Sequence, residues 1–268
     1  MSRFEPSGVI TITTDFGHKG PFAAVMKGVI LMRFPGASIV DLAHDIPAHW
    51  PPEAGFWISR SYRYFPRGTV HVAIVDPGVG TERGIVITKH DDHIFMAPDN
   101  GLLAPILGCA ADVRRLREDA LQAVGLGPPS QTFHGRDIFA PLAAEFATGR
   151  LGPDAVSDPF PDWTPGWLDD PEVGDRRVDG IVVTVDTFGN LISNIDKAMI
   201  TAFREPTVHF GGHRFAMQAT YGRVTPGDYL ALVNSFDVVE IARAEGSAAE
   251  GLGADRGAPV VVTDGPSA

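Results

Sequence analysis

A carboxylate and a guanidinium, Asp76 and Arg83, lie seven residues apart in one loop of this chain. The apolar run 70–75 before Asp76 predicts a buried strand, and a proline and two glycines after it predict a tight turn. Ligands of open α/β sheets bind beyond the carboxyl ends of the strands, so chemistry is expected at Asp76. This loop is therefore predicted to present a fixed negative and a fixed positive charge together.

Three further segments of the N-terminal half combine histidine with acidic residues: 14–18, 44–45 and 133–137. The first two follow predicted strands, and the third precedes a predicted helix whose N-terminus adds partial positive charge. Taken singly, each has an ordinary structural explanation, because an Asp in such a loop is more often a helix cap than a catalyst. Loops that follow parallel strands converge at one edge of a sheet, so the segments together favour one functional site.

In the C-terminal half, Asp186 and Asn190 flank Phe188 and a glycine between two predicted strands. These residue types are sufficient for a turn alone. They also carry the donors and acceptors that recognise an adenine edge or an amino-acid amine. A second polar corner, 234–237, lies between two strands of the same half. From the residues alone, both interpretations stay open.

The N-terminal half alternates predicted strands with amphipathic helices, and this order indicates a parallel sheet with right-handed crossovers. In chain order, the expected strands and helices are 9–14, 21–34, 38–42, 52–64 and 69–75. Two shorter strands, 84–90 and 93–97, and a helix at 139–148 are expected to follow.

Residues 151–178 are rich in proline and aspartate and are predicted to link two domains. Residues 1–150 would then be an N-terminal α/β domain with a mainly parallel sheet. Residues 179–268 contain short strand patterns at intervals of roughly 8–12 residues, which predict an all-β, barrel-like C-terminal domain. The predicted fold class is α/β with this second, all-β domain.

Composition narrows the function classes. The net charge of −11 argues against nucleic acid as a partner, since nucleic-acid binding needs basic surface. The single Cys109 excludes an intramolecular disulfide framework and a cysteine-rich zinc site. No apolar run is long enough for a transmembrane helix, and the N-terminus has no secretory signal pattern. A cytoplasmic enzyme or binding protein is expected.

Residue types alone also allow a metal-dependent phosphoesterase with a two-metal site of nitrogen and oxygen ligands. Its candidate ligands are Asp15, His18, His44, Asp45, Asp76, Asn100 and His134. Against it, no strand-end loop holds a His-x-His or Asp-x-His pair, and Arg83 is a poor neighbour for cations. We therefore expect no metal.

Five motifs of the chain occur in the same order in a known family. Over nearly its whole length the chain resembles the S-adenosylmethionine (SAM) hydroxide adenosyltransferases, which are SAM hydrolases forming adenosine and relatives of the fluorinase and chlorinase enzymes. The motifs that carry the resemblance are Thr14-Asp15-Phe16-Gly17, Val75-Asp76-Pro77-Gly78-Val79-Gly80, Ala97-Pro98-Asp99-Asn100-Gly101, Phe133-His134-Gly135-Arg136-Asp137 and the segment from Asp186 to Asn190.

The resemblance implies an α/β domain followed by a barrel-like domain. It also implies a homotrimer with each active site between the N-terminal domain of one subunit and the C-terminal domain of its neighbour. An Asp–Arg–His set surrounds the attacking water in the hydrolases, and its roles fall here on Asp76, Arg83 and His134. The halogenases lack that acid, which argues for water rather than halide as the nucleophile. The resemblance implies neither a metal nor another cofactor.

The substrate contacts are also implied by this resemblance. They are Asp15 and Trp50 at the ribose, Asp186 at the methionine amine, Asn190 at the adenine, Ser235 at the methionine end, and Phe188 as a further substrate-binding residue. Phe236 replaces an arginine of the halogenases, so no residue is assigned to the methionine carboxylate. The predicted reaction is in-line attack of water or hydroxide at C5′ of SAM, giving adenosine and L-methionine. A non-catalytic SAM or adenosine binder remains the other alternative.

Overall fold

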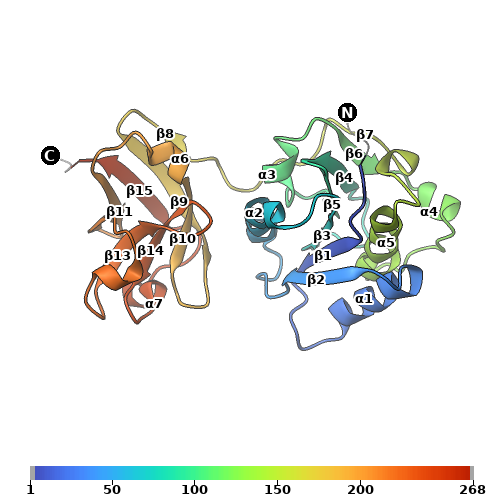
Figure 1. The fold of residues 1–268 in the computed structure, drawn as a ribbon, viewed down its shortest axis with the longest axis horizontal. Coiled ribbons are helices and arrows are strands. Elements are labelled where there is room, and N and C mark those ends of the chain that lie inside the picture. Colours follow the sequence, from blue (N-terminus) through green and yellow to red (C-terminus); the bar gives the residue numbers. More distant parts are fainter. Residues whose placement is uncertain (1–3, 266–268) are drawn as a thin grey trace. The chain divides into compact units, whose positions relative to one another are not determined.

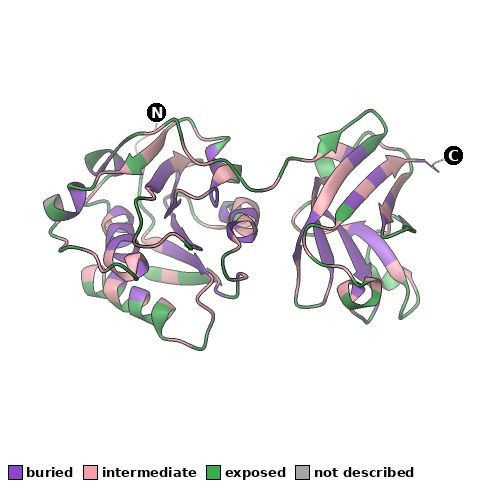
Figure 2. Ribbon diagram, turned by 180° about the vertical axis from the view of Figure 1, so that it is seen from behind, coloured by how far each residue is buried: buried purple, intermediate pink, exposed green. Residues whose placement is uncertain are grey.

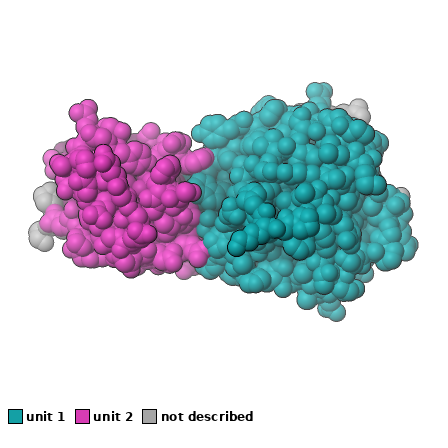
Figure 3. Space-filling view, turned by 90° about the horizontal axis from the view of Figure 1, so that it is seen from below, with its two compact units in different colours: residues 1–167 teal, residues 168–268 magenta. Residues whose placement is uncertain are grey.

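A computed structural model describes residues 4–265 of the chain. The chain divides into two compact units, residues 1–167 and residues 168–268, which are coloured separately in Figure 3. The division falls inside the segment 151–178 that was expected to be a linker. Much of that segment belongs to the first unit, because its strand β7 (Ser157–Pro159) pairs with β6 (Val113–Leu116).

Unit 1 is built on a seven-stranded sheet in the order β2-β1-β3-β5-β4-β6-β7 (Figure 1). Its parallel half contains β1 next to β2 and β3, and β3 next to β5, while β4, β6 and β7 pair antiparallel. The remaining strand bounds are β1 Val9–Thr14, β2 Ser38–Ala43, β3 Val70–Ile74, β4 Ile85–His90 and β5 His93–Pro98. The predicted α/β architecture is confirmed, with a mixed sheet in which three strand pairs are parallel and three are antiparallel.

Helices cover both faces of this sheet. On one face α1 (Phe22–Arg33) packs with α5 (Ala140–Thr148), and on the other α2 (Pro51–Ser61) packs with α3 (Ala104–Leu107). Strand β3 contributes to both cores, because Val72 and Ile74 face α1 and α5 whereas the intervening Ala73 faces α2. Figure 2 shows such buried strands in purple. A strand covered on both faces reads as one apolar run, as residues 70–75 do.

Unit 1 also contains several short helical segments. A five-residue π-helical turn, Gly135–Phe139, leads directly into α5, and α4 (Ala120–Ala123) precedes it. Three-residue 3₁₀ turns lie at Tyr62–Tyr64 and Pro153–Ala155. In the described part of the chain, no helix is long and apolar enough to cross a membrane.

Unit 2 is an antiparallel sheet in the order β12-β11-β15-β9-β10-β14-β13, with β8 paired to β9. A single bridge between Met217 and Ala231 joins the ends of this order, so the sheet is nearly closed. The predicted barrel-like architecture is confirmed. The strands are β8 Glu172–Val173, β9 Arg177–Val185, β10 Leu191–Asp196, β11 Pro206–Phe210, β12 His213–Ala216, β13 Tyr229–Val233, β14 Val238–Arg243 and β15 Pro259–Asp264, and the helical segments are α6 Lys197–Ile200, a 3₁₀ turn Tyr221–Arg223 and α7 Ala248–Leu252.

Candidate active site

The loop after β3 brings Asp76 and Arg83 into direct contact. Nε of Arg83 donates to both carboxylate oxygens of Asp76 at 3.0 Å, and its Nη2 also contacts Oδ2. The two side chains are only 5% and 11% exposed for Asp76 and Arg83, respectively. A buried pair of this geometry is held firmly, because separating it would leave an uncompensated charge away from water. The spacing-based expectation that one loop presents both charges is thus met by the geometry.

His134 joins this pair from a distant part of the sequence. Its Nδ1 lies 2.9 Å from Nη2 of Arg83, at the residue that precedes the π-helical turn Gly135–Phe139. Arginine has only donors, so Nδ1 must accept this hydrogen bond and the proton of the neutral ring lies on Nε2. Burial, followed by the charge of Arg83, lowers the pKa of His134 below 6.5. The ring is therefore a neutral donor at physiological pH.

The loop itself is fixed by a close backbone approach. Gly80 has φ +78°, and a Cβ at this position would lie 2.1 Å from the carbonyl oxygen of Gln131. Only glycine fits this backbone without displacement. The Asp76 loop therefore packs directly on the segment that leads to His134. Asn100 also supports the end of β3, because its Nδ2 donates to the Val75 carbonyl at 2.8 Å.

Asp15 and Trp50, the predicted ribose contacts, come from neighbouring loops of unit 1. Oδ2 of Asp15 accepts from the backbone N–H of His49 at 3.2 Å, and Trp50 follows directly before α2. The Trp50 ring lies edge-on to Trp167, with ring centroids 5.9 Å apart. Asp15 is half-buried and retains further acceptor capacity for hydroxyl groups.

A series of side-chain hydrogen bonds stabilises the loop that contains Asp15. Thr14 Oγ1 lies 2.8 Å from Nδ1 of the buried His44, whose Nε2 lies 2.9 Å from Oδ1 of Asp41. The carbonyl of His44 accepts from the N–H of Gly17 at 2.8 Å. Both ring nitrogens of His44 are thus occupied by protein partners. His44 therefore has a structural role in positioning the loop.

The candidate ligands of the metal-site alternative are distributed among separate contacts. His18 pairs with Asp45, His44 with Thr14 and Asp41, and His134 with Arg83. Among residues 4–265, no group of three or more histidine, cysteine or acidic side chains could hold a metal ion. The two-metal phosphoesterase therefore lacks a converging ligand set in this part of the chain.

In unit 2, Asp186 and Asn190 form the expected turn. Oδ1 of Asp186 accepts from the backbone N–H groups of Phe188 and Asn190 at 2.9 Å, and its Oδ2 accepts from Asn190 Nδ2 at 3.0 Å. Phe188 projects outward and is 78% exposed. A carboxylate has about four acceptor sites, so this turn geometry leaves capacity for a ligand amine.

Ser235 lies on the second polar corner, between β13 and β14. It is exposed, and its turn is shaped by Asn234, whose Oδ1 accepts from the N–H of Phe236 at 2.9 Å. Nδ2 of Asn234 donates to Glu240 Oε2 at 2.9 Å, and Tyr221 donates to Glu240 Oε1 at 2.8 Å. Sequence reasoning missed Glu240 and Tyr221. The available signal was one acidic residue within the otherwise apolar strand 238–242.

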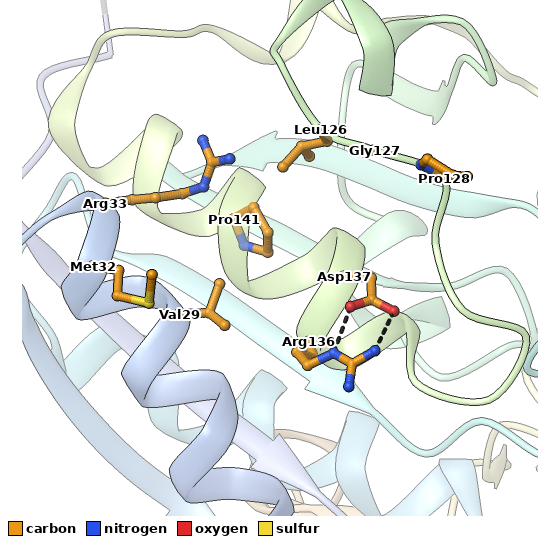
Figure 4. A pocket seen from close by; sticks show the side chains of 9 residues that line it. All are labelled: Val29, Met32, Arg33, Leu126, Gly127, Pro128, Arg136, Asp137 and Pro141. Carbon is orange, nitrogen blue, oxygen red and sulfur yellow. Dashed lines mark hydrogen bonds and ion pairs between the residues drawn. The ribbon is translucent and has the colours of Figure 1, made fainter.

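A separate pocket of about 330 Å³ opens beside α1 (Figure 4). It is lined by Val29, Met32, Arg33, Leu126, Gly127, Pro128, Arg136, Asp137 and Pro141. None of the predicted site residues lines it. The pair Arg136–Asp137, drawn with its contacts in Figure 4, follows His134 on the same helical segment.

The fold and the site together define a class of protein: an α/β unit that carries a partly buried Asp–Arg–His set, followed by a barrel-like unit with polar turns. Sequence comparison names the family. The chain belongs to the SAM hydroxide adenosyltransferases, because the family's N-terminal domain model matches residues 10–156 and its C-terminal domain model matches residues 180–261.

Curated relatives cover almost the whole chain. A protein of Thermus thermophilus named (R)-S-adenosyl-L-methionine hydrolase is 37% identical over 254 residues, which are 92% of this chain and 96% of the relative. A protein of the same name from Methanocaldococcus jannaschii is 30% identical over 260 residues, 92% of each chain. A fluorinase of an Actinoplanes species is 25% identical over 225 residues, covering 70% of this chain and 72% of the fluorinase.

Solved structures share the fold. An uncharacterized conserved protein from Thermotoga maritima superposes with a TM-score of 0.85 at 32% identity, covering 95% of this chain and 99% of the other. A conserved hypothetical protein from Thermus thermophilus gives a TM-score of 0.76 at 32% identity, with 94% and 98% coverage.

Proposed function

We propose that this protein hydrolyses S-adenosyl-L-methionine to adenosine and L-methionine. One observation carries the proposal: the Arg83 guanidinium contacts the Asp76 carboxylate and Nδ1 of His134 simultaneously. Such a set can hold a water molecule beside a carboxylate that accepts its proton. The names of the curated relatives support the same reaction and specify the (R) epimer at sulfur, which we extend to this chain.

In this reaction, the nucleophile requires more catalytic assistance than the leaving group. The sulfonium leaves C5′ as a neutral thioether, so the leaving group requires neither an acid nor a metal. Water is a weak nucleophile, but its protons become acidic as the C–O bond forms. Asp76 then accepts a proton late in the step, and such general-base catalysis typically contributes about 10²–10⁴-fold. Alignment of the water at about 3–3.5 Å from C5′ contributes further.

The three side chains have distinct roles in this proposal. Arg83 orients the Asp76 carboxylate through its paired hydrogen bonds. His134 accepts from Arg83 at Nδ1 and therefore offers an Nε2–H donor. This donor orients the oxygen of the attacking water and leaves proton acceptance to Asp76. The carboxylate also offsets the guanidinium charge next to a cationic substrate.

Substrate recognition is proposed for the remaining predicted residues. Asp15 binds the ribose hydroxyls and Trp50 lines the ribose. Asp186 binds the methionine amine and Asn190 the adenine, with Phe188 and Ser235 alongside. The free acceptor capacity of Asp15 and Asp186 supports these roles.

We further propose a homotrimer, in which each active site combines the N-terminal unit of one subunit with the C-terminal unit of its neighbour. The family resemblance supports this arrangement. Unit 1 carries the residues proposed for chemistry and for the ribose, whereas unit 2 carries those proposed for the amine and adenine, so a complete site needs both.

Incubation with SAM in ¹⁸O-water tests the reaction. We expect adenosine and methionine in equal amounts, with the label in the 5′-hydroxyl of adenosine. Parallel incubations with fluoride or chloride should give no 5′-halo product, and the two sulfonium epimers should be consumed at different rates. Tight binding of SAM without adenosine formation would identify a binding protein instead.

A further inference from the structure

Glu240 is a buried acidic residue that the proposed chemistry does not use. It lies in the middle of β14 and is 2% exposed, opposite Ile192 of β10 and Leu232 of β13. Its neighbours Val239 and Ile241 point into the main core of unit 2, so Glu240 points to the other face of the sheet. Burying a carboxylate costs free energy unless it accepts hydrogen bonds. The residues that donate to Glu240 therefore indicate its role.

Both carboxylate oxygens of Glu240 accept hydrogen bonds from side chains in the loops between strands. Tyr221 Oη donates to Oε1 at 2.8 Å from the 3₁₀ turn between β12 and β13. Asn234 Nδ2 donates to Oε2 at 2.9 Å from the turn between β13 and β14. No residue of the 3₁₀ turn is buried, and the Tyr221 ring is 45% exposed. Its hydroxyl is thus anchored in the sheet while its ring faces outward.

The contact with Asn234 determines the shape of the Ser235 turn. Because Nδ2 points to Glu240, Oδ1 of Asn234 faces the turn and accepts from the N–H groups of Phe236 at 2.9 Å and Val238 at 3.4 Å. One carboxylate therefore fixes the orientation of the amide and, through it, the turn that presents Ser235.

Asp186 directly follows Val185, the last residue of β9, which pairs with Leu191 of β10; Leu191 in turn pairs with Ile241, the residue after Glu240. Burial raises the pKa of Glu240, and the negative charge of Asp186 adds to this effect despite the hydrogen bonds from Asn234 and Tyr221. Burial, Glu240 and Asp186 also raise the pKa of Tyr221. Glu240 thus connects the Tyr221 side chain with the Ser235 turn, and its charge interacts with that of Asp186.

We propose that Glu240 is a positioning residue for SAM recognition, holding the Tyr221 side chain and the Ser235 turn in place through its two hydrogen bonds. This inference rests on the proposed function. Glu240 acts through its neighbours, so its removal should weaken substrate binding while leaving the chemical step in unit 1 intact.

Two substitutions separate geometry from charge. Glu240→Leu removes both hydrogen bonds. Glu240→Gln keeps both, because its amide oxygen accepts from Asn234 while its amide N–H donates to the hydroxyl oxygen of Tyr221. Tyr221→Phe removes only the hydrogen bond to Oε1 of Glu240. Ser193→Ala is the matched control, since Ser193 is also buried in this sheet and donates to the Val239 carbonyl at 2.7 Å.

Steady-state kinetics of adenosine formation and thermal unfolding are measured for all four variants. We expect Glu240→Leu to raise KM for SAM by at least about tenfold and Tyr221→Phe by about threefold or more, with kcat within about threefold of wild type. Glu240→Gln should restore KM to within about threefold. Ser193→Ala should lower the unfolding temperature without raising KM.

Three results would overturn the positioning role: an unchanged KM in Tyr221→Phe and Glu240→Leu, an equal loss in Glu240→Gln, or a raised KM in Ser193→Ala. If Glu240→Leu does not fold, Tyr221→Phe and Glu240→Gln still decide the question. If wild type binds SAM without turnover, the proposed reaction fails, and the dissociation constants of SAM for the same variants test the positioning role. If wild type does not bind SAM, both proposals fail.

Discussion

The Arg83 guanidinium lies 2.9 Å from Nδ1 of His134, and this contact fixes which nitrogen of the imidazole carries the proton. Arginine cannot accept a hydrogen bond, so Nδ1 must be unprotonated. Protonation of the ring would place two donors against each other. The contact therefore persists only while His134 is neutral, which links the geometry of the site to pH.

The midpoint of the acidic decline in rate should consequently lie below pH 6.5. Burial and Arg83 lower the pKa of His134 below 6.5, so the neutral form remains dominant at that pH and is lost as pH decreases through the lowered value. The measurement is kcat/KM for SAM between about pH 8 and pH 5. A midpoint at or above pH 6.5 would contradict the assigned protonation state.

Replacement of Asp76 by alanine should reduce turnover by at least about 10²-fold while SAM still binds. The proposed substrate contacts lie on other residues, whereas the proton acceptor is lost. Turnover is measured by adenosine release and binding by calorimetry. Glu145→Ala is the matched control, because Glu145 is 14% exposed and accepts from both Arg33 and Arg150. It should lower stability and leave turnover unchanged. Equal loss of binding and turnover in Asp76→Ala would indicate a structural role.

The contact between Asp76 and Arg83 illustrates what local sequence can predict. A strand that is apolar at every position except His71, followed by proline and glycines, places both charges in one loop without knowledge of the rest of the fold. His134 is different, because it reaches Arg83 across 51 residues. No local pattern specifies that contact, and only the family resemblance predicted it.

Strand β7 shows a second limit of prediction from local sequence. Ser157–Pro159 has no apolar alternation, and it is a strand only because β6 offers it a partner edge. The same proline- and aspartate-rich composition suggested a linker. Glu240 was missed for a related reason: a polar residue in a strand usually faces solvent, and here the connection that carries Tyr221 covers it.

Gly80→Ala should impair both stability and turnover. The added Cβ would lie 2.1 Å from the Gln131 carbonyl oxygen at φ +78°, so the Asp76 loop or the segment before His134 must move. We expect a loss of about 1–3 kcal/mol in unfolding free energy, and a lower kcat because the three side chains separate. Gly127→Ala is the control, since no atom lies within 4 Å of its Cβ position. Similar effects of both substitutions would show that the close approach is unimportant.

Unit 1 should lose stability in acid through His71. This histidine is 1% exposed, with Nδ1 2.8 Å from Thr11 Oγ1 and Nε2 3.2 Å from His93 Nδ1. Burial, followed by His93, lowers the pKa of His71 from 6.5 to about 3. The unfolded chain therefore binds more protons between these values, so stability is lost as pH decreases through this window.

Urea unfolding at pH 7 and pH 4.5 measures this loss, to which His71 should contribute on the order of 2 kcal/mol. His71→Gln does not titrate and should show a correspondingly smaller difference between the two pH values. His18→Gln, at an exposed position, should behave as wild type. The same acid sensitivity in His71→Gln and wild type would exclude His71 as its source.

Mixing two inactive variants should test whether subunits share active sites. In the proposed trimer, Asp76→Ala inactivates the half-site of unit 1, and Asp186→Ala weakens the half-site that unit 2 offers to a neighbouring subunit. After subunit exchange, some sites combine an intact unit 1 with an intact unit 2. Random assembly of equal amounts makes up to about a quarter of the sites fully intact in a closed ring.

The matched control for this experiment is a mixture of Asp76→Ala with Arg83→Ala. Both substitutions affect the same unit, and the two residues contact each other within one loop. Every site in such mixed trimers carries one of the two defects, so exchange restores no activity. Recovery in the first mixture and not in the second, together with a trimer mass by light scattering, requires sites built from two subunits. If neither mixture recovers although exchange is verified with a labelled subunit, each chain must complete its own active site.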